Sequence, residues 1–290
     1  MRPSLVFVLL LIGCESSSPD TSDANVDPDG DDTPACALTA NTTPTSVVNE
    51  GCPVLERDTS ACEADRRAAG LDGFWLKFSC RVTLTKPTAD TVQMASDGLP
   101  DHTSNYFAAT DACHDDFVPE KNNPNELAPH TLRITVLAAP SASAVGSPMN
   151  LGTIGMALNG VALFSNRAAG DDDIYVESQG FDRCHGHPTG RDQYHYHTEP
   201  WSISVDDGAF IGIFMDGFPV YGRHDPSGSI PTDLDQSGGH TGATLDSATA
   251  VYHHHVNFQT STAAGTMNET EWFMSTGFYS GPVGTCVGCP

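Results

Sequence analysis

Hydrophobic and polar residues alternate along two segments in the first half of the chain. Apolar residues occupy every second position over 74–84 and again over 132–136. A period of two places one set of side chains on a single face of a β-strand. We therefore predict a strand over 74–84 that ends at Pro87, and a second strand over 132–136. The segment 63–71 instead favours a short helix.

Two later segments, 155–164 and 212–221, resemble each other. Each carries a turn dipeptide between apolar residues, Asn159–Gly160 in the first and Asp216–Gly217 in the second. Such dipeptides are strong signals of a β-hairpin with a two-residue turn. The glycines of the two turns lie 57 positions apart (217 − 160). We predict one hairpin in each segment, and turn formation is a sufficient role for the aspartate of the second one.

Each predicted hairpin is followed by the same order of histidine motifs. After the first come Gly186–His187 and the run Tyr194–His195–Tyr196–His197. After the second come Gly239–His240 and the run Tyr252–His253–His254–His255. Because two separate features recur in one order, we interpret the pattern as an internal duplication. It predicts a pseudo-symmetric pair of repeat units, at about 155–200 and 212–258.

The histidines at the repeated positions are candidate metal ligands. Residues i and i+2 of a strand point to the same face, so His195 lies beside His197 and the second motif repeats this arrangement. A third imidazole from a glycine-rich loop would complete a triad in each unit, and imidazole suits zinc, copper, iron or nickel. The predicted ligands are His187, His195, His197, His240, His253 and His255, with His102 and His185 as weaker candidates.

The histidine pattern leaves several readings open. Each unit could hold one ion, or the two units could build a single two-metal site. A buried hydrogen-bonded network without metal, or an exposed polar stripe, would have the same spacing. We expect Cys184, inside the first cluster, to form a disulfide rather than to bind metal. Asp235 is a candidate for orienting a ligating histidine.

The order of these motifs resembles that of the YHYH-domain family. The resemblance covers about 95–260. It has two departures: Ser237 stands where the family often has Cys, and His254 stands where it often has Tyr. The resemblance implies membership of a family and no particular activity. The segments that carry it are 97–102, 154–160, 194–197, 216–222, 234–235, 238–240 and 252–255.

The N-terminal segment predicts export and lipid attachment. A positively charged start precedes the apolar run 5–12, which is typical of a secretory signal and too short to span a membrane. The residues 11–14 resemble a bacterial lipobox, so we expect a signal peptide over 1–13 and a lipid anchor on Cys14. Because residue 15 is Glu15 rather than aspartate, we expect the outer membrane of the bacterial cell envelope.

Composition then limits the class of protein. The chain has 13 Lys and Arg against 37 Asp and Glu, a formal net charge of −24, so nucleic acid is not an expected partner. The 27 glycines and 20 prolines favour strands, turns and long loops over a helical bundle. We therefore predict a mainly β fold with antiparallel, sandwich-like sheets and long loops.

The cysteines agree with an exported chain. Without Cys14, eight of the nine cysteines remain, an even number that indicates a disulfide-bonded fold. Cys286 and Cys289 have no helix signal around them, so we expect a structural rather than a redox role. The expected regions are a signal peptide (1–13), an acidic disordered tether (14–35), a cysteine-containing lead-in (36–72) and a β domain (73–290).

The sequence favours an exported, membrane-anchored lipoprotein with a histidine-rich transition-metal site. The exported location and the imidazole ligands favour copper over zinc without excluding zinc. A metal-dependent enzyme, hydrolytic or oxidative, is the first alternative, because three histidines and an open position are typical of catalytic zinc. A metal-free module for surface interactions is the second alternative.

Overall fold

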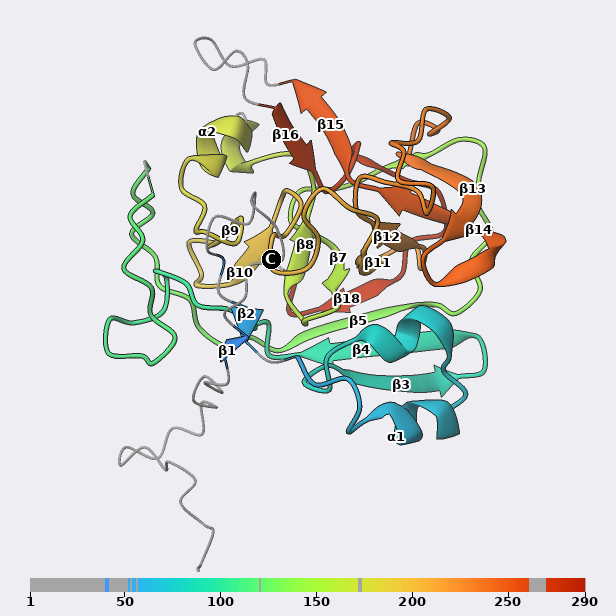
Figure 1. Cartoon of the computed structure of the whole chain (residues 1–290), viewed down its shortest axis with the longest axis horizontal. Coiled ribbons are helices and arrows are strands. Elements are labelled where there is room, and N and C mark those ends of the chain that lie inside the picture. Colours follow the sequence, from blue (N-terminus) through green and yellow to red (C-terminus); the bar gives the residue numbers. More distant parts are fainter. Residues whose placement is uncertain are drawn as a thin grey trace, which may run out of the picture. The chain divides into compact units, whose positions relative to one another are not determined.

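Strands dominate the part of the chain that the structure describes (Figure 1). The structure is a computed structural model, and it describes residues 40–41, 52, 54–55, 57–119, 121–171, 174–260 and 270–289. The predicted signal peptide, lipid-attachment site and tether lie outside these residues. The prediction of a mainly β, disulfide-bonded fold is confirmed.

The largest sheet has eight strands and contains both predicted repeat units. Its strand order is β13-β14-β12-β11-β7-β8-β10-β9. The first unit supplies one half of this order and the second unit supplies the other half. Equivalent strands therefore follow in the same order from either edge of the sheet. The strands are β7 (Thr153–Ala157), β8 (Ala162–Phe164), β9 (Gly186–Pro188), β10 (Tyr194–Tyr196), β11 (Phe210–Phe214), β12 (Pro219–Tyr221), β13 (Gly239–Thr244) and β14 (Ser247–His255).

Strand pairing relates the two units by an approximate two-fold axis between β7 and β11. These strands pair antiparallel, with Met156 opposite Ile213, its own equivalent in the other unit. In each unit the second hairpin strand pairs in parallel with the His-x-His strand, β8 with β10 and β12 with β14. The Gly-His strand then pairs antiparallel at the edge. The duplication seen in the sequence is therefore also a duplication of strand pairing, with two parallel pairs that the sequence did not predict.

The contact between β7 and β11 depends on two equivalent glycines. A Cβ on Gly155 would lie 2.4 Å from the carbonyl oxygen of Ile213, and one on Gly212 would lie 2.2 Å from that of Met156. We expect Gly212→Ala to lower the free energy of unfolding by about 2–3 kcal/mol, because the strands must move apart. Urea unfolding checks this, with Gly190→Ala as control, since its Cβ has no neighbour within 4 Å. Equal stabilities of the two variants would contradict the register.

Both predicted hairpins form, but their turns differ from the predicted type. Gly160 and Gly217 have positive φ angles of 95° and 84°, whereas Asn159 and Asp216 do not. A two-residue type I′ turn needs positive φ at both central residues. Each turn instead ends on a left-handed glycine, which is typical of three-residue hairpin loops.

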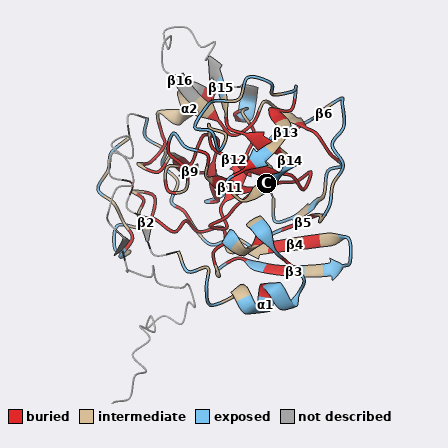
Figure 2. Ribbon diagram, turned by 45° about the vertical axis from the view of Figure 1, so that its right-hand side comes forward, coloured by how far each residue is buried: buried red, intermediate tan, exposed pale blue. Residues whose placement is uncertain are grey.

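A smaller four-stranded sheet, in the order β18-β5-β4-β3, shares a hydrophobic core with the large sheet. Val92 and Ile134 of the small sheet and Ile154 and Ile213 of the large one belong to this core. Buried residues gather around β11 and β12, whereas α1 is largely exposed (Figure 2). The predicted strand over 132–136 is confirmed as β5. The strands are β3 (Thr83–Thr88), β4 (Thr91–Ser96), β5 (Leu132–Leu137) and β18 (Thr285–Val287).

Most of the earliest predicted strand is wrong: only Thr83 and Leu84 of the span 74–84 lie in a strand, β3, which continues beyond Pro87 to Thr88. Residues Gly73–Lys77 form a 3-10 helix, η1. The predicted short helix does form as α1 (Glu63–Ala68), and its buried Arg66 donates hydrogen bonds to three backbone carbonyls within 78–82. The Cys62–Cys80 disulfide ties the same two segments together. These carbonyls are therefore satisfied by a side chain, and no partner strand is needed.

Disulfides connect cysteines that are distant in the sequence as well as near ones. The bonds between described cysteines are Cys52–Cys184, Cys62–Cys80 and Cys286–Cys289, and Cys113 is also disulfide-bonded. The expected disulfide at Cys184 is confirmed. Within the described residues, no helix has the length and apolar character needed to cross a membrane. The remaining elements are β1 (Ala40–Asn41), β2 (Val54–Leu55), β6 (Ser147–Pro148), η2 (Ala169–Asp171), α2 (Ile174–Ser178), β15 (Asn257–Thr260), β16 (Thr270–Phe273) and β17 (Phe278–Tyr279).

Candidate metal centres

The structure brings the six predicted ligands into two separate groups of three. In each group the ligand atoms lie within 4.8 Å of one another. Four strands separate β10 from β14 in the sheet, which corresponds to roughly 24 Å at the usual strand spacing. The geometry thus gives one group per repeat unit rather than one shared site. The first group is His187, His195 and His197, and the second is His240, His253 and His255 with Asp225.

Strand pairing places the third histidine of each group. His187 on β9 lies directly opposite His195 on β10, and His240 on β13 lies directly opposite His253 on β14. Side chains at opposite positions of an antiparallel pair have Cβ atoms about 4.5–5.5 Å apart. The predicted source of this histidine, a glycine-rich loop, is therefore wrong: it comes from a hydrogen-bonded strand.

His195 and His197 turn their Nε2 atoms toward each other at 3.0 Å. Their Nδ1 atoms lie 3.1 Å from the carbonyl oxygen of Gln193 and 2.5 Å from that of Ser165. Carbonyl oxygens only accept hydrogen bonds, so each Nδ1 carries the proton and each Nε2 presents a lone pair. Two lone pairs facing at this distance repel each other unless a proton or a metal ion lies between them. Tetrahedral zinc holds its nitrogen ligands about 3.3 Å apart, close to the observed separation.

The second group repeats this arrangement and adds a carboxylate. Nε2 of His240 lies 3.2 Å from Nε2 of His253. Oδ1 of Asp225 lies 3.3 Å from Nε2 of His240 and 3.5 Å from Nε2 of His255. Neither this oxygen nor Nε2 of His255 has a hydrogen-bond partner among the described residues. Three imidazoles and one carboxylate make a complete donor set for a four-coordinate ion.

The outward nitrogens of the second group are fixed as firmly as those of the first. His253 and His255 donate from Nδ1 to backbone carbonyls at 3.0 and 2.7 Å. The carbonyl that holds His255 belongs to Gly222, 57 positions beyond its equivalent in the first unit. His240 donates from Nδ1 to the carboxylate of Asp233 at 2.8 Å. Contacts of this kind set the tautomer of metal-binding histidines, and their loss typically weakens metal affinity about 10- to 100-fold.

Burial lowers the pKa values of all three histidines of the first group and of His253 and His255 in the second, which favours their neutral form. It lowers the pKa of His197 to about 4 and that of His253 to about 4. Burial, with the charge that neighbouring histidines would carry, also lowers the pKa values of His187 and His195 well below the usual range. The neutral imidazole is the form that binds metal, so the folded chain holds these ligands ready at neutral pH.

Acid is expected to destabilise the metal-free protein through these histidines. Between pH 6.5 and 4 the unfolded chain takes up protons on imidazoles that stay neutral in the folded chain, so the free energy of unfolding falls with pH. For His197, with a folded pKa of about 4, the loss is roughly 3 kcal/mol over this range. The test measures the free energy of unfolding in urea at several pH values between 6.5 and 4, for the chelator-treated protein and for its His197→Gln variant. A wild-type pH dependence no steeper than that of the variant would contradict this.

The tyrosines that alternate with the ligands point to the opposite face and hold the neighbouring strand. Tyr194 donates a hydrogen bond to Asp182 at 2.7 Å, and Tyr252 donates one to Asp235 at 2.9 Å. Each carboxylate also accepts a hydrogen bond from the backbone N–H of the glycine just before the third ligand. Asp235, a candidate for orienting a ligating histidine, contacts a tyrosine and the backbone instead.

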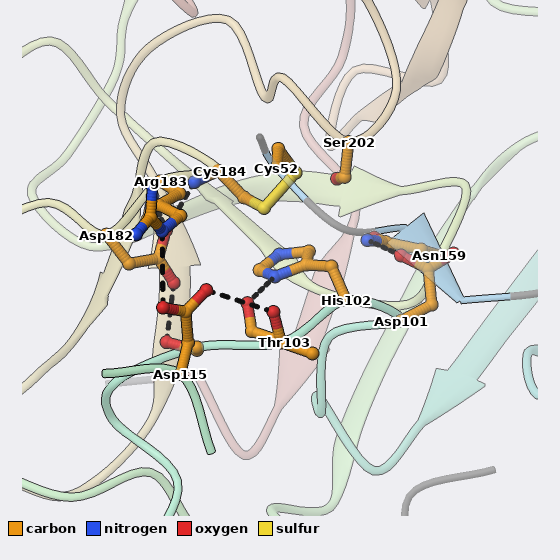
Figure 3. Close-up of a disulfide and its surroundings, with 12 residues drawn as sticks. Cys52, Asp101, His102, Thr103, Asp115, Asn159, Asp182, Arg183, Cys184 and Ser202 are labelled. Carbon is orange, nitrogen blue, oxygen red and sulfur yellow. Dashed lines mark hydrogen bonds and ion pairs between the residues drawn. A yellow bond between two sulfur atoms is a disulfide. The ribbon is translucent and has the colours of Figure 1, made fainter. Parts of the chain in front are cut away.

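The two weaker candidate ligands lie outside both groups. Nε2 of His102 lies 2.8 Å from the hydroxyl oxygen of Tyr196, on the face of β10 opposite the first group. Figure 3 shows His102 in the surroundings of the Cys52–Cys184 disulfide. His185 stacks on Trp201 at 3.9 Å between ring centroids, and its positive φ of 68° marks it as a turn residue. Neither side chain reaches the metal-binding geometry that the sequence allowed.

Two acidic residues with important contacts were not predicted. Asp225 precedes His240 by 15 positions (240 − 225) in the connection from β12 to β13, where no periodic pattern marks it. Asp216, for which turn formation was a sufficient role, is fully buried, and its Oδ2 lies 3.0 Å from Nε2 of His254. His254 points away from the second group because it alternates with two ligands along β14.

Comparison with known proteins agrees with the motif order. Residues 133–232 match the family described as YHYH protein. The match includes the first histidine group, the β11–β12 hairpin and Asp225, and it ends before β13. No curated protein and no solved structure matches the chain. Residues 133–232 are therefore a YHYH domain, as the motifs in this segment predict.

Proposed function

We propose that the chain binds two divalent transition-metal ions, one in each repeat unit, through Nε2 atoms of its histidine groups. The observation that carries the proposal is the pair of Nε2 atoms facing each other with their lone pairs, at 3.0 Å in the first unit and 3.2 Å in the second. A cation between them converts this repulsion into binding energy. Unfavourable geometry that recurs in both halves of a duplicated fold supports a ligand in both.

The donor atoms limit the metal. Cys184 is held in a disulfide, so it supplies no thiolate of the kind a blue-copper site needs. The carboxylate of Asp225 disfavours Cu⁺, which prefers sulfur ligands. Imidazole with one carboxylate suits Zn²⁺ and Cu²⁺, and we propose one of these two ions for each group.

We further propose that the protein works as a lipid-anchored protein of the bacterial cell envelope, in the outer membrane. The lipobox-like residues 11–14 support the anchor. The disulfides Cys52–Cys184 and Cys62–Cys80 support an oxidising compartment, where such bonds form and persist.

Metal-dependent catalysis at the first group is the second candidate function. The first group lacks a counterpart of Asp225 among the described residues within its 4.8 Å cluster, and its three histidines line a cavity. Three protein ligands and an accessible fourth position are typical of catalytic zinc, whereas a complete protein ligand set is typical of a structural site.

Metal analysis of the purified full chain tests the proposal. Protein exported by a bacterial host is dialysed, and its zinc and copper contents are measured by mass spectrometry before and after exposure to an equal mixture of both ions. We expect two equivalents of divalent metal per chain, and the ratio after competition identifies the preferred ion. A content below 0.2 equivalents after exposure, a threshold set at about a tenth of saturation, would overturn the proposal and favour the metal-free interaction module.

A further inference from the structure

A cavity of about 650 Å³ opens in front of the first histidine group. His187, His195 and His197 form part of its wall, and Nε2 of the buried His187 has no hydrogen-bond partner among the described residues. A ligand in this cavity would therefore meet the nitrogen atoms of the group, and any ion that they hold, directly.

The cavity gathers positive charge in an acidic chain. Lys121, Arg167 and Arg191 line it with one carboxylate, Glu177, although the whole chain has only 13 Lys and Arg against 37 Asp and Glu. Several arginines elsewhere pair with carboxylates, as Arg183 does with Asp115. Lys121 and Arg191 have no carboxylate within 4.0 Å in the part of the chain that the structure describes. Lys121 and Arg191 therefore favour an anionic ligand in this cavity.

Part of the cavity wall is apolar. The ring of Phe164 stacks on His195 at 3.9 Å between centroids, and Leu151, which is 45% exposed, lies on the same cavity. A cavity that combines apolar surface with a few convergent charges is typical of a binding site for a small organic molecule. An inorganic ion has no apolar part that could contact this surface.

The second unit indicates where the anionic oxygen would bind. There the carboxylate oxygen of Asp225 completes the group of three imidazoles. In the first unit the nearest counterpart is Glu177 on α2, whose Oε2 lies 3.7 Å from Nε2 of His197 but outside the 4.8 Å cluster. Glu177 therefore does not complete the first group as Asp225 completes the second, and the fourth position is open to an oxygen atom of a bound ligand.

We propose that this cavity binds a small organic oxyanion, a carboxylate or a phosphate on an apolar stem, with one oxygen on the metal ion of the first group. Lys121 and Arg191 hold the charge of the oxyanion, and Phe164 and Leu151 contact the stem. This inference rests on the proposed metal binding at the first group. The two units then differ in their fourth metal ligand: Asp225 supplies it in the second group, and the bound oxyanion supplies it in the first.

The test uses the full chain with His240→Gln/His253→Gln, so that only the first group remains. This variant is loaded with Co²⁺, whose visible spectrum reports a change of ligand, and titrated with benzoate, phenyl phosphate and neutral benzamide. We expect at least one anion to change the spectrum and to bind at least 10-fold more tightly than benzamide. The stronger of the two anions identifies the oxyanion that the cavity prefers.

Substitution of the cavity cations separates this inference from the proposed function. Adding Lys121→Gln/Arg191→Gln should weaken anion binding about 10-fold or more while the cobalt content stays at one equivalent. Adding Lys86→Gln/Arg133→Gln instead makes the same change of charge away from the cavity and should leave anion binding unchanged. Equal binding of benzamide, or equal effects of the two double substitutions, would overturn the oxyanion site alone. Failure of this variant to bind cobalt, zinc or copper would overturn the proposed metal binding at the first group.

Discussion

The His195→Gln/His197→Gln variant is expected to bind one metal ion where the unsubstituted protein binds two. The first group would keep only His187, whereas the second group lies four strands away in the sheet and shares no ligand with it. Loss of contacts around ligands already weakens affinity about 10- to 100-fold, so loss of two ligands is expected to exceed roughly 100-fold. Titration calorimetry with Zn²⁺ measures the number of sites and the affinity of each.

The converse variant and a control complete this experiment. His253→Gln/His255→Gln should also bind one ion, and a variant with all four substitutions should bind none. His114→Gln/His224→Gln removes two histidines that belong to neither group and should keep both ions. Loss of both ions in either double variant would contradict independent sites and would point to one cooperative centre.

Asp216→Ala is expected to be among the most destabilising single substitutions in the chain. Its carboxylate is fully buried and accepts hydrogen bonds from the backbone N–H groups of Phe218 and Ser280 as well as contacting His254. Burial raises the pKa of Asp216, but His254 and these N–H groups outweigh it, so the pKa is lowered and the carboxylate is charged. Its removal leaves several buried polar groups without a partner, which costs about 3–5 kcal/mol.

A double-mutant cycle assigns this loss to the contact with His254. Asp216→Ala and His254→Leu together should cost less than the sum of the single variants, because the double variant no longer leaves a buried imidazole unpaired. Asp116→Ala, which removes an exposed carboxylate, should change the free energy of unfolding by less than about 0.5 kcal/mol. Additive losses in guanidinium unfolding would contradict an energetically coupled pair.

The duplication explains why His254 departs from the family pattern. In the first unit Tyr196 takes the equivalent position, and its hydroxyl oxygen lies 3.1 Å from the side-chain nitrogen of Asn159. In the second unit His254 contacts Asp216, the equivalent of Asn159. A tyrosine–asparagine pair has thus been exchanged for a histidine–aspartate pair. The two units differ at both of these positions, and the paired differences preserve one buried contact between the hairpin turn and the His-x-His strand.

Local sequence patterns predicted the features that depend on neighbouring residues. The hairpin dipeptides, the alternation over 132–136 and the i, i+2 spacing of His195 and His197 each concern a single element, and each appears in the structure. The spacing of the duplicated motifs also predicted the two units. These signals suffice because strand geometry fixes the direction of a side chain from its position alone.

Features that depend on distant contacts could not be predicted in the same way. The alternation over 74–84 indicated a strand, but Arg66 occupies the carbonyls that a partner strand would need. Asp225 reaches the second group through an irregular connection, so no period identifies it. His102 matched the family pattern, yet its contact is with Tyr196 on the far face of the strand. In each case a tertiary contact decides the role of the residue.

Anomalous diffraction from crystals of the metal-loaded full chain tests the central claim most directly. Data collected at the absorption edge of the bound metal locate each ion independently of the protein coordinates. We expect two anomalous peaks per chain, one surrounded by Nε2 of His187, His195 and His197 and the other by Nε2 of His240, His253 and His255 with Asp225, at about 2.0–2.2 Å. Peaks confined to other residues, or no peak at either group, would contradict the account.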